Sequence, residues 1–172
     1  STRRSPAGEP GSFRMTAPRS AEKKRALMVG FNYRFFDSIQ QAKKIVEHGT
    51  IGAVVSIRIV HGHPGRPGYE KEWRMNKELA GGGVLMDQGL HCIDLARWFL
   101  QGPITSVFGS VSNFVWKTRV EDAASLILKT KAGKLATLSV SISEWKPVFS
   151  LHILYEKGYI AIDGLGRKYG DG

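Results

Sequence analysis

The sequence predicts an α+β fold, in which a largely antiparallel, open sheet carries helices on one face. Helical patterns come early in the chain, whereas apolar runs with turn signals between them follow one another in the second half. In residues 135–143, LATLSVSIS, aliphatic side chains alternate with serine and threonine. Such a strand can pack one face on helices and leave a mildly polar face outside.

The first elements are read from short patterns. The apolar run at 26–33, ALMVGFNY, is typical of a strand. Residues 38–52, SIQQAKKIVEHGTIG, predict a helix that ends at Gly49, because glycine is a frequent helix stop. Residues 53–63 alternate and are rich in β-branched side chains, which favours a strand. The predicted helix has one apolar face, made of Ile39, Ala42, Ile45 and Val46.

A long loop and a core helix occupy the middle of the chain. Residues 64–83 begin with prolines and glycines that exclude regular structure, and long loops in compact domains are often functional. Residues 80–100, AGGGVLMDQGLHCIDLARWFL, predict the core helix. The segments TKAGK and EKGY are hairpin turns between later strands. Those strands are expected at 104–116, 123–130, 135–143, 149–155 and 159–163.

The distribution of charge argues against base-specific nucleic-acid binding. The chain has 172 residues and a formal net charge of +10, of which half falls within residues 1–25. That segment is rich in proline, glycine, serine and arginine, so we expect a disordered leader there and a single domain over 26–172. The remaining basic residues are scattered, without a recognition-helix or RNA-binding pattern.

Neither a membrane span nor an internal disulfide is expected. No apolar run approaches the ~18 residues that a spanning helix needs. Cys92 is the only cysteine, which favours a reducing compartment and a cytoplasmic location. It falls on the apolar side of the predicted helix, where a buried, unreactive thiol is expected.

The helix at 80–100 carries ionisable groups along one stripe. At about 100° per residue, His91, Asp94 and Trp98 all fall within about 40° of Asp87. A carboxylate four residues before an imidazole can orient the ring and favour its charged form, which suits acid–base catalysis. A solvated helix face, with Asp94 paired to Arg97, explains the same spacing. The preceding glycines allow close approach to another segment.

Two other patterns carry less chemistry. His61 and His63 share a strand face and could join Asp87 and His91 around a metal such as zinc, but structural hydrogen-bonded histidines are the preferred interpretation, and no metal ligand is assigned. The segment at 164–170, GLGRKYG, imitates a dinucleotide-binding turn, yet no helix is expected after it to hold a pyrophosphate.

The order of these motifs resembles the Gfo/Idh/MocA oxidoreductases. The segments that carry the resemblance are MVGFNYRF, EHGTIG, HGHPGRPGYEKEWR, GGGVLMDQGLHCIDLARWFL and EKGYIAIDGLG, and they span about residues 26–170. The glycine-rich start followed by Asp87, three residues and His91 is the most specific part. Members of the family combine a Rossmann domain that binds NAD or NADP with a C-terminal domain that binds a sugar, cyclitol or sugar nucleotide.

The resemblance assigns roles to particular residues. It implies that His91 is the general acid or base at the carbinol and that Asp87 orients His91 or the substrate. Arg34, at the expected domain junction, is placed either near the substrate or in a structural salt bridge. The long loop at 64–83 faces substrate in such enzymes. The resemblance gives substrate binding to Tyr69, Lys71, Trp73 and Arg74.

The chain also departs from the family pattern. No glycine-rich βαβ unit precedes MVGFNYRF, and the family's catalytic lysine has no counterpart. We therefore expect 26–172 to be a substrate-binding and oligomerisation domain without its Rossmann domain and last elements, binding no NAD or NADP alone and inactive alone. Homo-oligomers are expected through the sheet face. The alternative is a non-enzymatic, sheet-mediated dimer that binds a carbohydrate or a protein partner.

Overall fold

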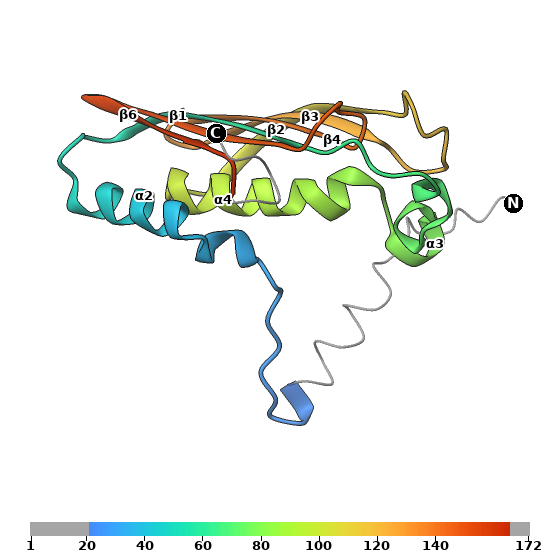
Figure 1. The fold of residues 1–172 in the computed structure, drawn as a ribbon. Coiled ribbons are helices and arrows are strands. Elements are labelled where there is room, and N and C mark those ends of the chain that lie inside the picture. The colour runs from blue at the N-terminus through green and yellow to red at the C-terminus, as the bar shows by residue number, and fades with distance from the viewer. Residues whose placement is uncertain (1–20, 166–172) are drawn as a thin grey trace, which may run out of the picture. The chain divides into compact units, whose positions relative to one another are not determined.

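The computed structural model describes residues 21–165 and divides the chain into two units, 1–30 and 31–172 (Figure 1). The predicted leader therefore lies mostly outside the described residues, as does most of the 164–170 segment. The strand predicted at 26–33 is wrong, because residues 25–31 carry no strand and a 3-10 helix, η1 (Asn32–Phe35), follows. A short apolar run does not by itself distinguish a strand from other structures.

Helix α2 (Asp37–His48) confirms the prediction for this segment. It ends at Gly49, which adopts the left-handed conformation with φ 70° and donates its N–H to the carbonyl of Val46 at 3.1 Å. Glycine accepts this conformation at little cost. Ile39 and Ala42 are buried as expected, whereas Ile45 remains 43% exposed.

Six strands form one sheet in the order β2-β3-β4-β1-β5-β6. All neighbouring strands are antiparallel except β1 and β4, which are parallel, so the predicted fold class is confirmed. The predicted strand ends agree within a few residues, apart from 104–116, where pairing stops at Ser112. The strands are β1 (Val54–Gly62), β2 (Ile104–Ser112), β3 (Ala123–Thr130), β4 (Leu135–Ser141), β5 (Val148–Tyr155) and β6 (Gly158–Asp163).

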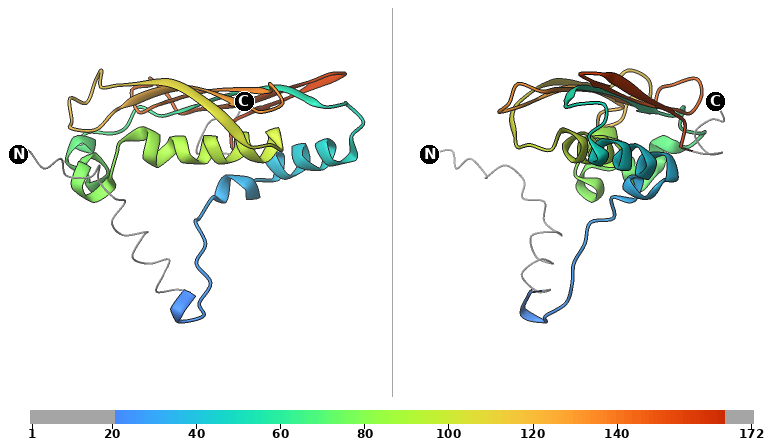
Figure 2. Two further views of the ribbon diagram at one scale, coloured as in Figure 1. Left: turned by 180° about the vertical axis from the view of Figure 1, so that it is seen from behind. Right: turned by 90° about the vertical axis from the view of Figure 1, so that its left-hand side faces the viewer.

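Helices α2 and α4 (Leu90–Leu100) lie against one face of the sheet (Figures 1 and 2). The alternation in β4 follows this layering, since Ala136, Leu138 and Val140 are buried and Thr137 and Ser139 are exposed. The core between the layers includes Leu95, Phe99, Ile59, Phe149 and Leu151, each fully or almost fully buried. Among the described residues, no helix is long and apolar enough to cross a membrane.

The connection between β1 and α4 positions the functional side chains. It contains two 3-10 turns, η2 (Tyr69–Lys71) and η3 (Trp73–Met75), and a short helix, α3 (Lys77–Ala80). The oxygen of Asn76 caps α3 by accepting the N–H groups of residues 78 and 79. A π-helical turn, η4 (Leu85–Gly89), then leads directly into α4.

Candidate active site

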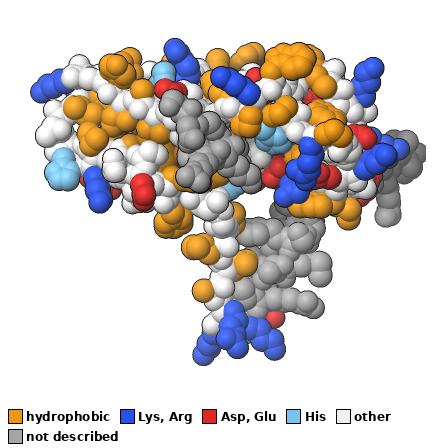
Figure 3. Space-filling view, viewed as in Figure 1, with side chains coloured by type: hydrophobic (Ala, Val, Ile, Leu, Met, Phe, Trp, Pro, Cys, Tyr) orange, Lys and Arg blue, Asp and Glu red, His pale blue; other side chains and the backbone are white. Residues whose placement is uncertain are grey.

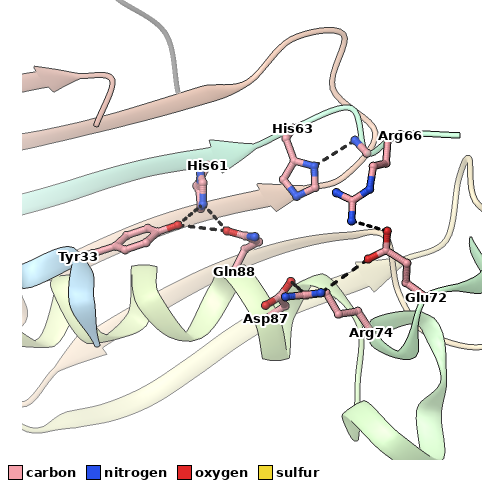
Figure 4. A network of polar contacts seen from close by, with 9 residues as sticks. Tyr33, His61, His63, Arg66, Glu72, Arg74, Asp87 and Gln88 are labelled. Atoms are coloured by element: carbon pink, nitrogen blue, oxygen red, sulfur yellow. Dashed lines mark hydrogen bonds and ion pairs between the residues drawn. The ribbon is translucent and has the colours of Figure 1, made fainter. Parts of the chain in front are cut away.

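A polar cleft of about 740 Å³ opens between the start of α4 and the loop that follows β1. Its walls come from four parts of the chain. These are η1, the loop at 63–74, the π-helical turn together with the first turn of α4, and the residue just before β5. Figure 4 shows several of these side chains converging from separate elements. The lining residues are Asn32, Tyr33, His63, Pro64, Gly65, Arg66, Tyr69, Glu72, Arg74, Asp87, Gln88, His91 and Pro147.

The π-helical turn changes how Asp87 and His91 relate to each other. Such turns are frequent at functional sites because they redirect side chains from the ordinary helical stripe. Asp87 forms an ion pair with Arg74, whose Nε lies 3.4 Å from the Oδ2 of Asp87. Asp87 and His91, which the sequence placed on one stripe, therefore contact different neighbours. Among the described residues no hydrogen bond joins them, and Asp87 acts on His91 only through its charge, which favours the protonated ring.

Two arginines of the cleft are balanced by carboxylates. Arg66 lies 2.6 Å from Glu72, and Arg74 lies 3.6 Å from the same carboxylate in addition to its contact with Asp87. Figure 4 shows this chain of ion pairs along one side of the cleft. Because each guanidinium already faces a carboxylate, the wall is rich in donors and acceptors but has no large excess of either charge.

His91 is held by aromatic contacts. Its ring is stacked on that of Tyr33, with centroids 4.2 Å apart and planes within 12°, and the edge of Phe31 approaches it at 6.1 Å. Its Nδ1 atom is buried and has no hydrogen-bond partner among the described residues. Burial lowers the pKa of His91 below its usual 6.5, against the smaller opposing effects of Asp87 and Asp94. The imidazole is therefore neutral at pH 7 and can accept a proton.

Tyr33, which stacks on His91, belongs to a hydrogen-bonded group with His61 and Gln88. The hydroxyl of Tyr33 lies 2.8 Å from Nε2 of His61, and the side-chain amide of Gln88 contacts both (Figure 4). The Nδ1–H of His61 donates to the carbonyl of Val148 at 3.1 Å. Burial lowers the pKa of His61, so this imidazole is neutral and carries a single ring proton.

The glycines before the π-helical turn allow the close approach that the sequence predicted. A Cβ on Gly83 would lie 1.9 Å from the carbonyl oxygen of Glu121. That carbonyl accepts the N–H of Val84 at 3.0 Å, and the Glu121 carboxylate accepts the N–H of Leu85 at 3.1 Å. The first N–H groups of the turn are thus already bound, so this glycine-rich segment does not fit the pyrophosphate of a dinucleotide.

Trp116 supports the opposite wall of the cleft. Its indole N–H donates to the carbonyl of Ile142 at 2.7 Å, and its ring packs against Tyr69 at 5.7 Å. At Gly65, with φ +71°, a Cβ would meet the Trp116 ring at 2.4 Å. The loop that carries Trp116 is held by Asp122, whose buried carboxylate accepts the N–H groups of residues 114, 115 and 116 at 2.7 to 3.0 Å.

Four of the six site residues expected from the sequence line the cleft, namely Tyr69, Arg74, Asp87 and His91. The other two, Lys71 and Trp73, are outside its lining, and Trp73 is 55% exposed with the Arg74 guanidinium over its ring. The sequence did not single out Tyr33 or Gln88. Their contacts with His61 join positions 27 and 28 residues apart, and their contact with each other spans 55 residues, so no local spacing could have revealed them.

Asp94 has a structural role. Its partner is Arg34, in a two-point contact, rather than Arg97 as the helical spacing suggested. The structural salt bridge that was one of the two expectations for Arg34 is therefore confirmed. Burial raises the pKa of Cys92 to about 12, in keeping with the expected unreactive thiol.

His61 and His63 do not form a metal site with the helix residues. His61 is engaged with Tyr33 and Val148, while the Nδ1 of His63 accepts the N–H of Gly65 at 3.0 Å. Within residues 21–165, no group of three or more histidine, cysteine, aspartate or glutamate side chains is arranged to hold a metal ion. The structural interpretation of these histidines agrees with their contacts.

The layered sheet with a polar cleft beside α4 defines a two-layer α+β domain. A family model described as the GFO/IDH/MocA C-terminal domain matches residues 39–161. The chain therefore belongs to the Gfo/Idh/MocA family of oxidoreductases, as the motifs from GFNYRF to EKGYIAID indicated.

Several relatives are dehydrogenases. Levoglucosan dehydrogenase of Pseudarthrobacter phenanthrenivorans is 33% identical over 108 residues, which cover 62% of this chain and 27% of that protein. Inositol 2-dehydrogenase of Rhizobium meliloti is 31% identical over 125 residues, which cover 70% of this chain and 36% of that protein. A solved structure of levoglucosan dehydrogenase in complex with NADH and levoglucosan matches with a TM-score of 0.72 and 25% sequence identity. The match covers 81% of this chain and 40% of that one. The chain spans about a third of the length of these curated relatives.

Proposed function

We propose that this chain is the sugar-binding part of an NAD- or NADP-dependent dehydrogenase, with its substrate in the cleft beside His91. The observation that carries this proposal is a neutral imidazole lining a polar cleft, with its Nδ1 buried and without a partner. A buried polar atom left without a hydrogen bond is costly, and such groups are tolerated where they serve function. The relatives whose names describe sugar and cyclitol dehydrogenases support the same assignment.

His91 is the proposed acid–base group. Since Nδ1 is buried, Nε2 is the nitrogen that a ligand in the cleft can reach. It would accept the hydroxyl proton of the carbinol during oxidation and return it during reduction, a role that commonly accelerates a reaction ~10²–10⁴-fold. The lowered pKa keeps the ring unprotonated near pH 7, which suits the oxidative direction.

Asp87 and Arg74 are proposed to bind and orient the substrate. Their ion pair at 3.4 Å presents a carboxylate and a guanidinium to the same cleft, and both groups bind hydroxyl oxygens of a sugar well. Because the cleft's arginines are balanced by carboxylates, we favour an uncharged polyhydroxylated substrate over a sugar nucleotide. Lys71 and Trp73 have no part in this arrangement.

The described residues do not hold the cofactor in this proposal. The N–H groups at the glycine-rich start of the π-helical turn are bound by Glu121, and the sheet lacks a strand–glycine turn–helix unit among residues 21–165. NAD or NADP would be held by a nucleotide-binding domain other than the part described, and the chain alone would be inactive. The chain contributes the sugar cleft and the proton-transfer group.

The decisive experiment joins this chain to the nucleotide-binding domain of a relative such as inositol 2-dehydrogenase. Cofactor reduction is followed with cyclitols, anhydrosugars and monosaccharides, using NAD and NADP in turn. We expect oxidation of at least one sugar or cyclitol, a ~100-fold or larger loss of kcat in His91→Ala, and a raised KM in Asp87→Asn. Lys44→Ala, exposed on α2, is the matched control. Equal activity in His91→Ala would refute the acid–base assignment.

A second proposed property is self-association through the outer face of the sheet. That face carries a groove of about 370 Å³, and Phe108 and Ile127, which pair across β2 and β3, are 75% and 43% exposed there. Hydrophobic side chains also line the upper rim of the molecule in Figure 3, on the side of the strands. Exposed apolar patches of this kind are typical of subunit interfaces, whether or not the chain is catalytic.

Sedimentation of the chain tests this property. We expect a dimer or higher oligomer that dissociates in Phe108→Lys, because a charge on the groove opposes burial. Phe114→Lys is the control, since Phe114 is 68% exposed but follows β2 in a loop. A monomer at high protein concentration, or equal dissociation in both variants, would rule out association through the sheet.

A further inference from the structure

His91 obtains its orientation from a ring contact. The Tyr33 ring lies nearly parallel to the imidazole, with the ring centroids 4.2 Å apart. Because Nδ1 of His91 is buried without a partner, no hydrogen bond at that atom fixes the ring plane. The flat, buried face of Tyr33 is what limits rotation of the imidazole about its χ2 bond.

Tyr33 is itself anchored by groups on other elements. Nδ1 of His61 donates to the carbonyl of Val148, and Nε2 of the same ring lies 2.8 Å from the Tyr33 hydroxyl. The Tyr33 hydroxyl also donates to the side-chain oxygen of Gln88 at 3.3 Å. The ring of Phe149 meets Tyr33 edge-on at 6.1 Å. The tyrosine on η1 is thereby connected to β1 and β5, two neighbouring strands of the sheet.

We propose that Tyr33 is a positioning residue for His91, with His61 as its anchor on the sheet, and that this pair sets the direction in which Nε2 of His91 meets the substrate. The inference rests on the proposed function, because it assigns how the proposed acid–base group is aimed. Small errors in the direction of a proton-transfer group reduce turnover far more than binding. Tyr33 touches His91 by ring stacking and needs no contact with the reacting atoms.

The first test needs no catalysis and uses the 172-residue chain itself. Proton–carbon NMR spectra follow the His91 ring through a pH titration in Tyr33→Leu, Tyr33→Phe and His61→Gln, with Tyr155→Phe as a control for loss of a buried tyrosine hydroxyl elsewhere. We expect His91 to titrate at lower pH in Tyr33→Leu, because leucine offers no aromatic face to the imidazolium, and to keep its midpoint in Tyr155→Phe. An unchanged midpoint in Tyr33→Leu would overturn the proposal.

A double-mutant cycle tests whether His61 acts on His91 through Tyr33. The cycle also tests the positioning role of Tyr33 if Tyr33→Leu fails to fold. Tyr33→Phe keeps the ring and loses its hydroxyl, and His61→Gln removes the imidazole that the hydroxyl contacts. We expect each to move the His91 ring resonances, and the double variant to move them no further than the larger single change. Additive shifts, or none from His61→Gln, would show that His61 does not act through Tyr33.

The second test uses the joined dehydrogenase. We expect Tyr33→Leu to lower kcat about tenfold or more while KM changes less than about twofold. Tyr33→Phe keeps the stacked ring but loses the contact with His61, so we expect it to restore part of the rate. An equal loss in both parameters, or no recovery with phenylalanine, would reduce Tyr33 to a structural residue. If the joined protein oxidises no sugar, the proposed function fails while the NMR titration still decides the positioning role.

Discussion

Arg34 and Asp94 form a two-point ion pair that connects η1 to α4, with both N–O distances at 2.6 Å. The Arg34 guanidinium also lies over the ring of Trp98 at 5.1 Å. The pair raises the pKa of Arg34 through its hydrogen bond to the carboxylate. Since Tyr33 directly precedes Arg34, this contact holds the short helix that carries the ring under His91.

Replacement of either partner is therefore expected to loosen η1. Arg34→Lys loses the second hydrogen bond of the planar fork, and Asp94→Asn loses the charge. We expect each to lower the free energy of unfolding by about 1–2 kcal/mol, a moderate effect because Arg34 is partly exposed. Urea unfolding of both single variants and the double variant measures it. Single effects that simply add in the double variant would contradict a direct interaction.

The close packing at Gly83 predicts intolerance of any side chain. A Cβ there would meet three backbone atoms of Glu121 within 3.0 Å, which cannot move as a flexible side chain would. Gly83→Ala should cost about 3 kcal/mol or more and displace the π-helical turn. Gly158→Ala is the matched control, because its Cβ meets Ile51 only at ordinary contact distance, 3.7 Å. Comparable stability of the two variants in thermal unfolding would contradict the structure.

Asp122 is expected to be a stability residue that also shapes the cleft. Its buried carboxylate accepts three successive N–H groups, those of residues 114, 115 and 116. Asp122→Ala should reduce the free energy of unfolding by about 2–4 kcal/mol, because buried donors are left without partners. Hydrogen exchange at residues 114–116 should accelerate in the same variant. Unchanged protection of these amides would show that the carboxylate does not hold the loop.

The stability of the chain should fall as the pH is lowered through the histidine range. Burial lowers the pKa of both His61 and His91 in the folded state below 6.5, so below that value the unfolded chain binds more protons. Unfolding free energy therefore rises with pH up to about 6.5 and levels off above it. His61→Gln should make this dependence less steep. Urea unfolding midpoints that rise as the pH is lowered would contradict the predicted direction of this pH dependence.

Much of the fold could be predicted because local patterns carry it. The alternation in 135–143 and the stop at Gly49 each reflect a physical rule that acts within a few residues. The run at 26–33 failed because a short apolar segment acquires its structure from its surroundings, and Tyr33 from this segment is buried in a 3-10 helix. The periodicity of apolar residues therefore predicts helix or strand reliably in long segments, and less reliably in short apolar runs.

The site was predictable only in part. Asp87 and His91 stood out by residue type and spacing, and both line the cleft. The helical wheel assumed 3.6 residues per turn, whereas the π-helical turn at 85–89 gives Asp87 and His91 different neighbours. Tyr33 and His61 were missed as partners because they meet only after the sheet and η1 have packed together.

The pH dependence of sugar oxidation by the joined dehydrogenase tests the central claim most directly. If His91 accepts the carbinol proton, kcat/KM should fall at acid pH as its imidazole is protonated, with a midpoint below 6.5 because burial lowers the pKa of His91. In His91→Asn the remaining rate should no longer depend on pH over that interval. An acid limb of the same midpoint in the variant would show that another group accepts the proton.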